Sequence, residues 1–564
     1  MRHASRLTVA AAVLAGLFGV AALASSATAP RPVPPEPPRV LVDTTYAPPA
    51  GRTIAVRAGG DFQAALRAAQ PGDVITLQAG AVFRGNFTLP RKTGAGWIVI
   101  RSSSADAELP PPGTRITPGF APAMPRLVTP NRVPVIQVAP GARGYRFIGI
   151  ELTLGENVRY IRQIVAFGGT QASLAETPSD LILDRCYIHG HASADVFRGV
   201  LLNSAASAVI DSHISEIHVA GHDSQAILGF NGPGPFKIVN NYLEGAGENI
   251  MFGGGDPSIP GLVPSDIEIR HNHLFKPLRW RRGAPDFVGI PWTVKNLLEL
   301  KNGQRVLIEG NALENVWPES QGGAAVVLTP RNGGAAPWSV VQDVMFRNNI
   351  VRNAVGGFGG QSTDNGNPSQ SMRRIAIINN LWLSIDRSFF TMAIPPVPLV
   401  DFLVDHNTAI PTRHFSYDID GPAPAFVRFQ FTNNLTGFGV YGVKFPRTEP
   451  MVTRWLPGAI IASNALVDLG QVDEGRTSSG SQPWELSASM YAVFPNAEAA
   501  GLKSDGTLEA TGPLKGAGTD HMDIGVDFRK LQRAMRTGRS SLAARSTHYG
   551  TYEPPARTLA HPRP

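Results

Sequence analysis

The residues best suited to chemistry in this chain lie between positions 296 and 333. Glu299 and Lys301 stand two positions apart in NLLELKNG, and Arg331 precedes an Asn-Gly pair in TPRNG. Alternate residues of a β-strand point to the same face, so Glu299 and Lys301 would share one surface. A carboxylate with two cations nearby can move a proton and neutralise an anion. These are the tasks that an acidic substrate would require.

Asn-Gly pairs recur along the chain and suggest an alignment of further residues. If the pairs mark the same turn in successive repeats, the residues before them form a charged column with Glu299 beside it. A solvated column of salt bridges is the structural alternative, because surface ion pairs are common and individually weak. The alignment selects Lys301, Arg331 and Asp364, which precede Asn-Gly pairs, and Asn231, which begins another pair; Asp364 and Asn231 are candidates for substrate binding.

Two further groups of side chains are candidates for binding or hydrolysis. In FKPLRWRRG, Trp280 stands between Arg279 and Arg281 and offers a ring face beside cations, which suits a sugar acid, although packing of the ring within the protein is the alternative. Glycosidases need two carboxyl groups about 5 to 9.5 Å apart, a separation that neighbouring repeats could provide. The candidates are Glu244, Glu248, Asp256 and Glu299, and Glu248 is also a candidate for substrate binding.

Histidines gather in HISEIHVAGHDSQ, which contains His213, His218, His222 and Asp223. Such residues can bind zinc, but strand alternation would disperse them and their spacing matches no zinc motif. We expect them to be turn and loop residues. The single cysteine, Cys186, excludes an internal disulfide and is expected to be a small buried core residue.

The elements that must position these residues follow from a repeat of the form apolar, any, apolar, any, any, Asn. Short apolar stretches of period two separate its members, which indicates coils of parallel strands, a solenoid. Stacked coils would place these asparagines in a buried ladder at a turn. Ser212 and Cys186 take the same place upstream. The asparagines are Asn241, Asn272, Asn311, Asn349, Asn380, Asn407, Asn434 and Asn464.

Four segments are predicted along the 564 residues. Residues 1–24 have the charged and apolar regions of a secretory signal, which predicts a secreted or periplasmic protein without a transmembrane segment in the mature chain. Residues 25–50 are a Pro-rich linker. Residues 51–527 form the solenoid, in which Asp61 caps a short helix that covers the open end. Residues 528–564 form a basic tail.

The opening FQAALRAAQPGDVITLQAG, the Asn repeat and the closing GAGTDHMDIGVD resemble the pectin-lyase-like class. The resemblance implies an all-β, single-stranded right-handed parallel β-helix with an N-terminal capping helix and an Asn ladder. Stretches such as VKNLLELKNGQRVLIEGN are similar to an exported bacterial β-helix group of unclear role. The chain lacks the Asp-Asp and Arg-Ile-Lys motifs of β-helix polygalacturonases and the Arg-x-Pro-x-x-Arg pattern of pectate lyases.

Lys301 and Arg331 are also similar, in order and coil placement, to a catalytic Lys and Arg of alginate lyases and chondroitinase B type enzymes. That resemblance implies β-elimination at a uronate and calcium as a possible cofactor. Glu299, the acidic residue near the Lys, is a third candidate catalytic residue. The acidic pair that precedes the Lys in those enzymes is absent here, which leaves calcium dependence open.

These observations lead to an expected function and two alternatives. We expect an exported monomer that acts on an acidic polysaccharide, most simply as a lyase. The alternatives are a noncatalytic carbohydrate-binding or cell-surface β-helix, and a glycoside hydrolase with paired carboxylates. Nucleic acid is not an expected partner. The net charge of +7 equals that of residues 528–564 alone, which hold eight Lys or Arg and one Glu, so the predicted solenoid is not basic.

Overall fold

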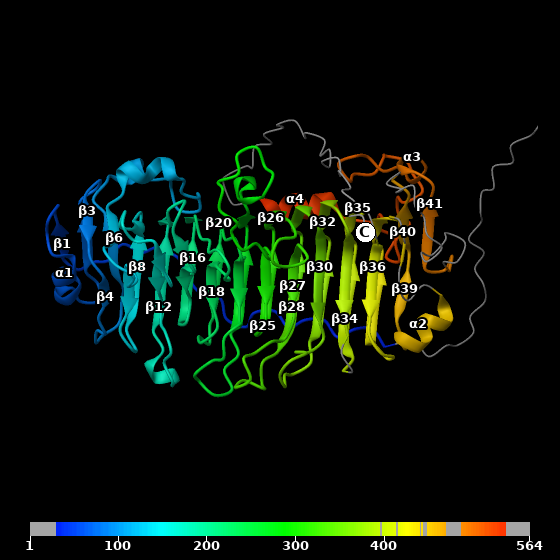
Figure 1. Cartoon of the computed structure of the whole chain (residues 1–564), viewed down its shortest axis with the longest axis horizontal. Helices are drawn as coiled ribbons and strands as arrows, with labels where there is room; N and C mark the ends of the chain where they lie inside the picture. The colour runs from blue at the N-terminus through cyan, green and yellow to red at the C-terminus, as the bar shows by residue number, and fades with distance from the viewer. Residues whose placement is uncertain are drawn as a thin grey trace, which may run out of the picture.

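Three long sheets of parallel strands run along the molecule (Figure 1). The computed structural model describes residues 30–394, 397–412, 415–439, 442–443, 448–469 and 487–536. The predicted signal, residues 1–24, and most of the predicted tail, residues 537–564, lie outside this part of the chain.

Within the described residues, sheets A and B contain fourteen strands each and sheet C contains eleven. Sheet A consists of β1 (Thr53–Val56), β2 (Val74–Leu77), β5 (Ile98–Ser102), β8 (Arg143–Ile148), β12 (Ser179–Asp184), β16 (Ala205–Ile210), β19 (Phe236–Val239), β22 (Ser265–Arg270), β25 (Gly303–Glu309), β28 (Val341–Arg347), β31 (Arg373–Ile378), β34 (Leu399–Asp405), β37 (Phe426–Thr432) and β39 (Ile460–Ala462). Sheet B consists of β3 (Val82–Arg84), β6 (Arg126–Thr129), β9 (Glu151–Leu154), β13 (Tyr187–His189), β17 (His213–Ser215), β20 (Tyr242–Glu244), β23 (His273–Phe275), β26 (Ala312–Val316), β29 (Ile350–Ala354), β32 (Leu381–Ile385), β35 (Thr408–Thr412), β38 (Leu435–Gly437), β40 (Asn464–Val467) and β41 (Tyr491–Phe494). Sheet C consists of β4 (Phe87–Leu89), β7 (Ile136–Val138), β11 (Val165–Ala166), β15 (Arg198–Leu201), β18 (Gln225–Gly229), β21 (Glu248–Phe252), β24 (Leu298–Leu300), β27 (Ala324–Leu328), β30 (Gly356–Gln361), β33 (Ser388–Ala393) and β36 (Phe415–Asp420).

From β2, β3 and β4 to β34, β35 and β36, each turn of the chain contributes one strand to each sheet. The strands β25, β26 and β27 enter sheets A, B and C in that order, and β28 then pairs with β25 in parallel. The apolar residue of each period-two pair points inward, so Ile308, Leu313 and Val326 are fully buried in one continuous core. This arrangement is a parallel β-helix. A short pair, β10 (Tyr160–Ile161) and β14 (Asp195–Val196), lies outside the three sheets.

The N-terminal end of the core is covered by the predicted helix, α1 (Phe62–Ala68). The Asp61 carboxylate accepts a hydrogen bond from the Ala64 N–H at 2.8 Å, which satisfies one of the donors at the start of the helix. Phe62 and Leu66 are buried against the first coils, as predicted. The other helices among the described residues are η1 (Asp106–Glu108), η2 (Pro118–Ala123), η3 (Leu174–Glu176), η4 (Leu278–Trp280), α2 (Glu449–Trp455), α3 (Ala497–Ala500) and α4 (Phe528–Met535).

The repeated asparagines lie one per coil at the turn between sheets A and B. From Asn241 to Asn464, each side-chain amide donates to the side-chain oxygen of the next asparagine, over distances of 2.9 to 3.1 Å. The same oxygen also accepts the backbone N–H of the preceding asparagine, so these buried polar groups are satisfied within the column. Ser212 and Cys186 continue the column upstream, because the Ser212 N–H donates to Asn241 Oδ1 and the Cys186 N–H donates to Ser212 Oγ.

Both predicted flanking segments differ from their expected form where the structure describes them. Residues 30–50 are extended, but they lie against sheet A instead of standing free, and their N–H groups bond to side chains of distant coils. The predicted tail begins with α4, because Phe528, Leu531 and Met535 form one apolar face that packs on Leu381 of sheet B. Within the described residues, no helix is long and apolar enough to cross a membrane.

Asn349→Ala should destabilise the protein by about 2 to 3 kcal/mol, because it leaves buried donors of Asn311 without an acceptor. The midpoint of chemical unfolding is the measurement. Asn157→Ala, at an exposed position, is the matched control and should change stability by less than about 0.5 kcal/mol. Equal midpoints for the two variants would contradict a stabilising role for the column.

Candidate functional site

The candidate site begins with a carboxylate placed in an apolar column of sheet C. The two leucines of β24 point into the core, so Glu299 between them points to the outer face. The register places Glu299 beside Met251 of β21 and Val327 of β27. Earlier coils of the same column carry Leu201 and Leu228, which form an apolar cluster with Met251. Along this column, the Glu299 carboxyl therefore lies next to apolar side chains.

The Glu299 side chain is 5% exposed and has three polar neighbours. Its Oε1 lies 3.5 Å from Lys301 Nζ, its Oε2 accepts from Asn296 Nδ2 at 3.1 Å, and its third neighbour is the Glu248 carboxyl. Burial, opposed by Lys301 and reinforced by Glu248, raises the pKa of Glu299 to about 7. A carboxyl with this pKa can take up and release a proton near neutral pH.

Glu248, at the start of β21, is a fully buried carboxylate with compensating partners. Its Oε1 lies 2.9 Å from Lys295 Nζ, and its Oε2 accepts from Gln225 Nε2 at 2.8 Å. Burial alone would raise the pKa of Glu248, but Lys295 and Lys301 outweigh it and lower the pKa below its usual value. The environments of Glu248 and Glu299 thus shift their pKa values in opposite directions, as is common for groups with different roles in proton transfer.

Lys301 and Arg331 lie on adjacent coils, as predicted, and the Arg331 N–H donates to the Lys301 carbonyl at 2.8 Å. The Lys301 side chain is 12% exposed and lies over Gly253, where a Cβ would come within 2.9 Å of Lys301 Cβ. Arg331 is exposed, and its Nη2 donates to Gln361 at 3.3 Å and Asn365 at 3.2 Å. The guanidinium is therefore oriented but accessible to an anion.

Asp364 and Asp256 shape the loop that carries Arg331. Asp364 accepts the N–H of Asn332 at 3.0 Å, and Asp256 accepts the N–H of Gly333 at 2.7 Å. Burial would raise the pKa of Asp364, but hydrogen bonds from backbone N–H groups and the nearby Arg331 together lower it. Both carboxylates thus hold backbone, which differs from the predicted role of Asp364 in binding substrate.

The predicted register of the Asn-Gly pairs is wrong. Gly303 begins β25 and pairs with Val341 in sheet A, whereas Gly333 lies in the loop after β27 of sheet C. Asn231 is fully buried, and its amide donates to two backbone carbonyls while its oxygen accepts the Ser258 N–H at 2.8 Å. No group of this side chain remains for a substrate, so its predicted binding role is not supported.

The predicted sugar-acid subsite around Trp280 is not available for stacking. Trp280 is 2% exposed and packs edge-on against His218, with ring centroids 5.3 Å apart. Arg279 Nη2 lies 2.5 Å from Glu216 Oε1, and Arg281 caps the end of η4. This insert follows β23 of sheet B, whereas Glu299 and Lys301 belong to sheet C. The alternation of apolar and polar residues in the sequence does not show to which of the three sheets a strand belongs, so it could not show that Trp280 lies apart from Glu299.

The clustered histidines are dispersed by the coil. His213 stacks on Tyr242 with centroids 4.4 Å apart, and His218 stacks on Trp292 at 3.8 Å. Asp223 pairs with Lys295 at 2.7 Å instead. Among the described residues, no group of three or more His, Cys, Asp or Glu side chains is arranged to hold a metal ion.

The carboxylates of the site do not fit the calcium that the resemblance implies. Calcium binds to several oxygen ligands that are free to surround it. Here the Lys295 ammonium occupies the space beside Glu248, and Lys301 lies next to Glu299. Two ammonium groups therefore already neutralise the carboxylates that a calcium ion would need.

Three residues of this cluster were missed in the sequence. Lys295 joins Asp223 and Glu248, and Gln225 supports Glu248 from the preceding coil. Lys276 lies near Glu248 and Lys295, and its Nζ donates to the carbonyls of residues 245, 246 and 247. Burial lowers the pKa of Lys276 to about 7. The sequence feature that could have indicated these residues is a lysine within an apolar stretch, such as Lys295 in TVKNLLEL.

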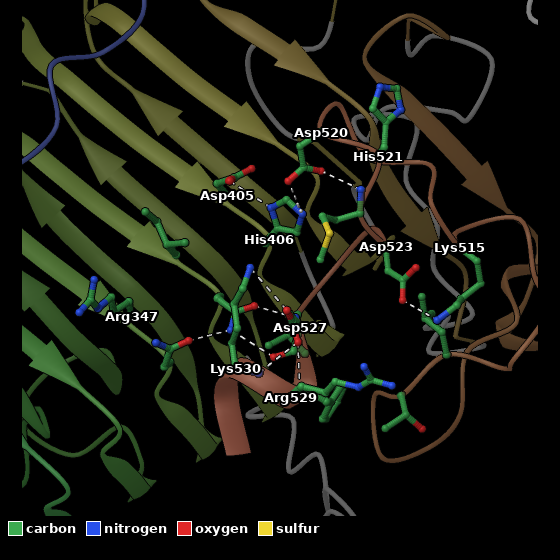
Figure 2. A pocket seen from close by; sticks show the side chains of 18 of the residues that line it. Arg347, Asp405, His406, Lys515, Asp520, His521, Asp523, Asp527, Arg529 and Lys530 are labelled. Atoms are coloured by element: carbon green, nitrogen blue, oxygen red, sulfur yellow. Dashed lines mark hydrogen bonds and ion pairs between the residues drawn. The ribbon is translucent and has the colours of Figure 1, made fainter. Parts of the chain in front are cut away.

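A separate cavity of about 810 Å³ lies between the coils and the C-terminal segment (Figure 2). Several of its charged groups pair with one another: His406 lies 3.0 Å from Asp405 and 3.5 Å from Asp520, and Lys515 pairs with Asp523. None of the predicted site residues lines this cavity. The cluster on sheet C remains the candidate site.

The sequence matches no family model and no curated protein. Among solved structures, the PL6 family alginate lyase AlyGC is 12% identical with a TM-score of 0.43, covering 84% of this chain and 57% of that chain. An alginate lyase from Paenibacillus sp. str. FPU-7 is 14% identical with a TM-score of 0.30, covering 66% and 98%. Pectate lyase Pel9A is 14% identical with a TM-score of 0.31, covering 84% and 96%. Likeness at this level transfers no activity.

The fold predicted from the sequence is confirmed. The chain is a parallel β-helix with long all-parallel sheets and few helices among the described residues.

Glu299→Gln should change how stability depends on pH. Because the folded state raises the pKa of Glu299 from 4.5 to about 7, its contribution is present below the lower value and is lost as the pH rises through the higher one. Between these two values, the variant should lose less stability than the unmodified protein. Thermal midpoints across this range are the measurement. The exposed control Glu156→Gln should follow the unmodified protein, and identical slopes for both variants would contradict the raised pKa.

Proposed function

We propose that the protein cleaves an acidic polysaccharide by β-elimination at a uronate, on the outer face of sheet C. The observation that carries the proposal is a partly buried lysine beside a carboxyl of pKa about 7, next to an accessible arginine on the adjacent coil. A lyase must neutralise the uronate carboxylate, remove the adjacent proton and protonate the leaving oxygen. Arg331 matches the first need, and Lys301, with Glu299 beside it, matches the second and third.

In this mechanism Arg331 pairs with the uronate carboxylate and stabilises the charge that develops there. Lys301 Nζ takes the proton from the carbon next to the carboxylate, a carbon–carbon double bond forms, and the bond to the leaving oxygen breaks. The Lys301 ammonium then returns the proton to that oxygen, so protons balance. Glu299 is almost fully buried and acts through Lys301, because its own protonation near pH 7 changes the field at the amine.

Export to the periplasm or the exterior belongs to the same proposal. The charged and apolar regions of residues 1–24 support it. An exported location would bring the site to polysaccharides outside the cytoplasm.

A hydrolase is the second candidate, and one observation favours it. Glu248 and Glu299 are neighbouring carboxyl groups whose pKa values shift in opposite directions, the pattern expected of a base and an acid. The other carboxylates considered from the sequence are engaged elsewhere, since Glu244 accepts from Tyr242 Oη at 2.7 Å and Asp256 holds a loop. Against this candidate, Lys295 neutralises Glu248 and both carboxyls are buried.

A screen of alginate, pectate, chondroitin and bacterial uronates tests the proposal. A lyase releases unsaturated products that absorb in the ultraviolet, whereas a hydrolase releases reducing ends without that absorbance. Binding without either product would identify the noncatalytic alternative. Only the first outcome supports the proposed reaction.

Lys301→Met should lower turnover by about 10²-fold or more, the scale of a lost acid or base. The thermal midpoint should change little, because Glu299, whose pKa is already raised to about 7, can take up a proton when the Lys301 charge is removed. Steady-state kinetics on the polymer found in the screen is the measurement, and Lys503→Met, at an exposed ion pair, is the control. Unchanged turnover in the first variant would refute the role of Lys301.

Arg331→Gln should weaken substrate binding and transition-state stabilisation together. We expect kcat/KM to fall by about 10²-fold, the scale for loss of one electrostatic donor to a developing charge. Arg57→Gln, on the exposed edge of the first coil, is the matched control. If both variants lost the same activity, Arg331 would have no specific role with the uronate carboxylate.

A further inference from the structure

Sheet A carries a column of alternating charges on its outer face, unrelated to the site on sheet C. At one position of this face an acidic or basic residue occurs in each coil from β22 to β37, and all six adopt positive φ between 52° and 60°. The repeated backbone conformation places their side chains at equivalent positions of successive coils. The column consists of Asp266, Arg305, Asp343, Arg374, Asp401 and Arg428.

The column is organised as three bidentate ion pairs. Arg305 donates to both oxygens of Asp266 at 2.7 and 3.1 Å, and the same geometry joins the pairs of the later coils. Such pairs hold each carboxylate in one orientation. One oxygen of every Asp still accepts a further hydrogen bond, and these oxygens recur at every second coil.

The N-terminal segment supplies those further donors. The N–H groups of Val33, Glu36 and Arg39 donate to Oδ1 of Asp401, Asp343 and Asp266, at 2.9, 3.0 and 2.9 Å. The segment therefore runs along the solenoid axis toward the first coils, as the dark blue trace shows (Figure 1). We call residues 32–39 the strap.

The strap has a period of three in both its donors and its packing. Donors occur at every third residue, and the prolines that face the sheet, Pro32, Pro35 and Pro38, are also three apart and less exposed than their neighbours. A period of three in a proline-rich segment is that of a polyproline II helix. The remaining positions are prolines, so every backbone N–H between residues 32 and 39 is bonded to the column.

The axial repeats of the strap and the column agree. A polyproline II helix rises about 3.1 Å per residue, so three residues span about 9.3 Å. Parallel strands lie about 4.7 to 4.9 Å apart, so two coils span about 9.4 to 9.8 Å. A three-residue step of the strap therefore matches a two-coil step of the column, and successive donors meet successive carboxylates without strain.

The segment beyond the strap is anchored on earlier coils. Val42 packs on Ile182 and Ala208 of sheet A, and Lys237 Nζ donates to Thr44 Oγ1 at 3.0 Å. Arg146 of β8 donates to the Thr44 carbonyl at 2.9 Å. The chain thus touches sheet A along its length from β34 back to β8.

We propose that the alternating Asp and Arg column is a binding track for a polyproline II helix, occupied in this protein by its own strap. The bound strap clamps the coils from β22 to β34, because it joins coils that do not touch each other. Coils of a solenoid otherwise contact only their neighbours, so they can open one after another from an end. With the strap bound, the coil that contains β34 can open only if the strap is also released.

Hydrogen exchange on the intact protein is the first test. The strap has three exchangeable backbone amides, at Val33, Glu36 and Arg39, so one peptide covering it reports on the proposed bonds alone. We expect exchange slower by about 10²-fold than in a free synthetic peptide of residues 30–46. Exchange at the rate of the free peptide would overturn the track.

The second test removes the donors and keeps the polyproline conformation. The variant Val33→Pro, Glu36→Pro, Arg39→Pro leaves every Asp and Arg pair intact but deletes all three N–H groups. We expect faster amide exchange in β28 and β34 and a lower thermal midpoint. Arg31→Pro, one residue before the strap, is the matched control and should behave as the unmodified protein. Equal exchange in the two variants would overturn the clamp.

Discussion

The stacking of parallel strands about 4.8 Å apart is the constraint on which the rest of this molecule depends. Every position of a coil then meets the same position of the next coil, so one residue type repeated along the sequence becomes a continuous row in space. A row of buried amides is stable only if each amide finds a partner, and the asparagines satisfy this by bonding to each other from Asn241 to Asn464. A row of like charges would repel, which is why sheet A alternates Asp and Arg.

The candidate site is a place where a row is interrupted. Leu201, Leu228 and Met251 occupy the outer column of sheet C, and Glu299 follows them in register. A carboxylate in that position loses water without gaining full compensation, so its pKa rises to about 7. Lys295 and Lys301 limit the cost by neutralising the pair that it forms with Glu248. The replacement of an apolar residue by Glu299 therefore both interrupts the repeat and produces the raised pKa on which the proposed chemistry depends.

The sequence predicts the repeat well because the Asn frame is local, and α1 is predicted from its cap and apolar face. It predicts the site less well, because inserts of different length separate the frames. Identical Asn-Gly pairs at residues 302 and 332 therefore fall in different parts of the coil. Lys301 and Arg331 still meet, since each follows a strand of sheet C. For Trp280 the sequence left both a sugar subsite and packing within the protein open, because composition does not show that the ring is buried and packs against His218.

The Pro-rich segment shows how local and distant information combine. Its composition fixes an extended conformation with a period of three, which is readable from the residues alone. Its position on sheet A depends on carboxylates that lie 227 to 368 residues further along the chain. The pairing can be recognised only when the rise per residue of the polyproline II strap is compared with the spacing between coils of the β-helix. A segment without a core of its own thus acquires a defined place, because its donors repeat at the interval at which the solenoid repeats its acceptors.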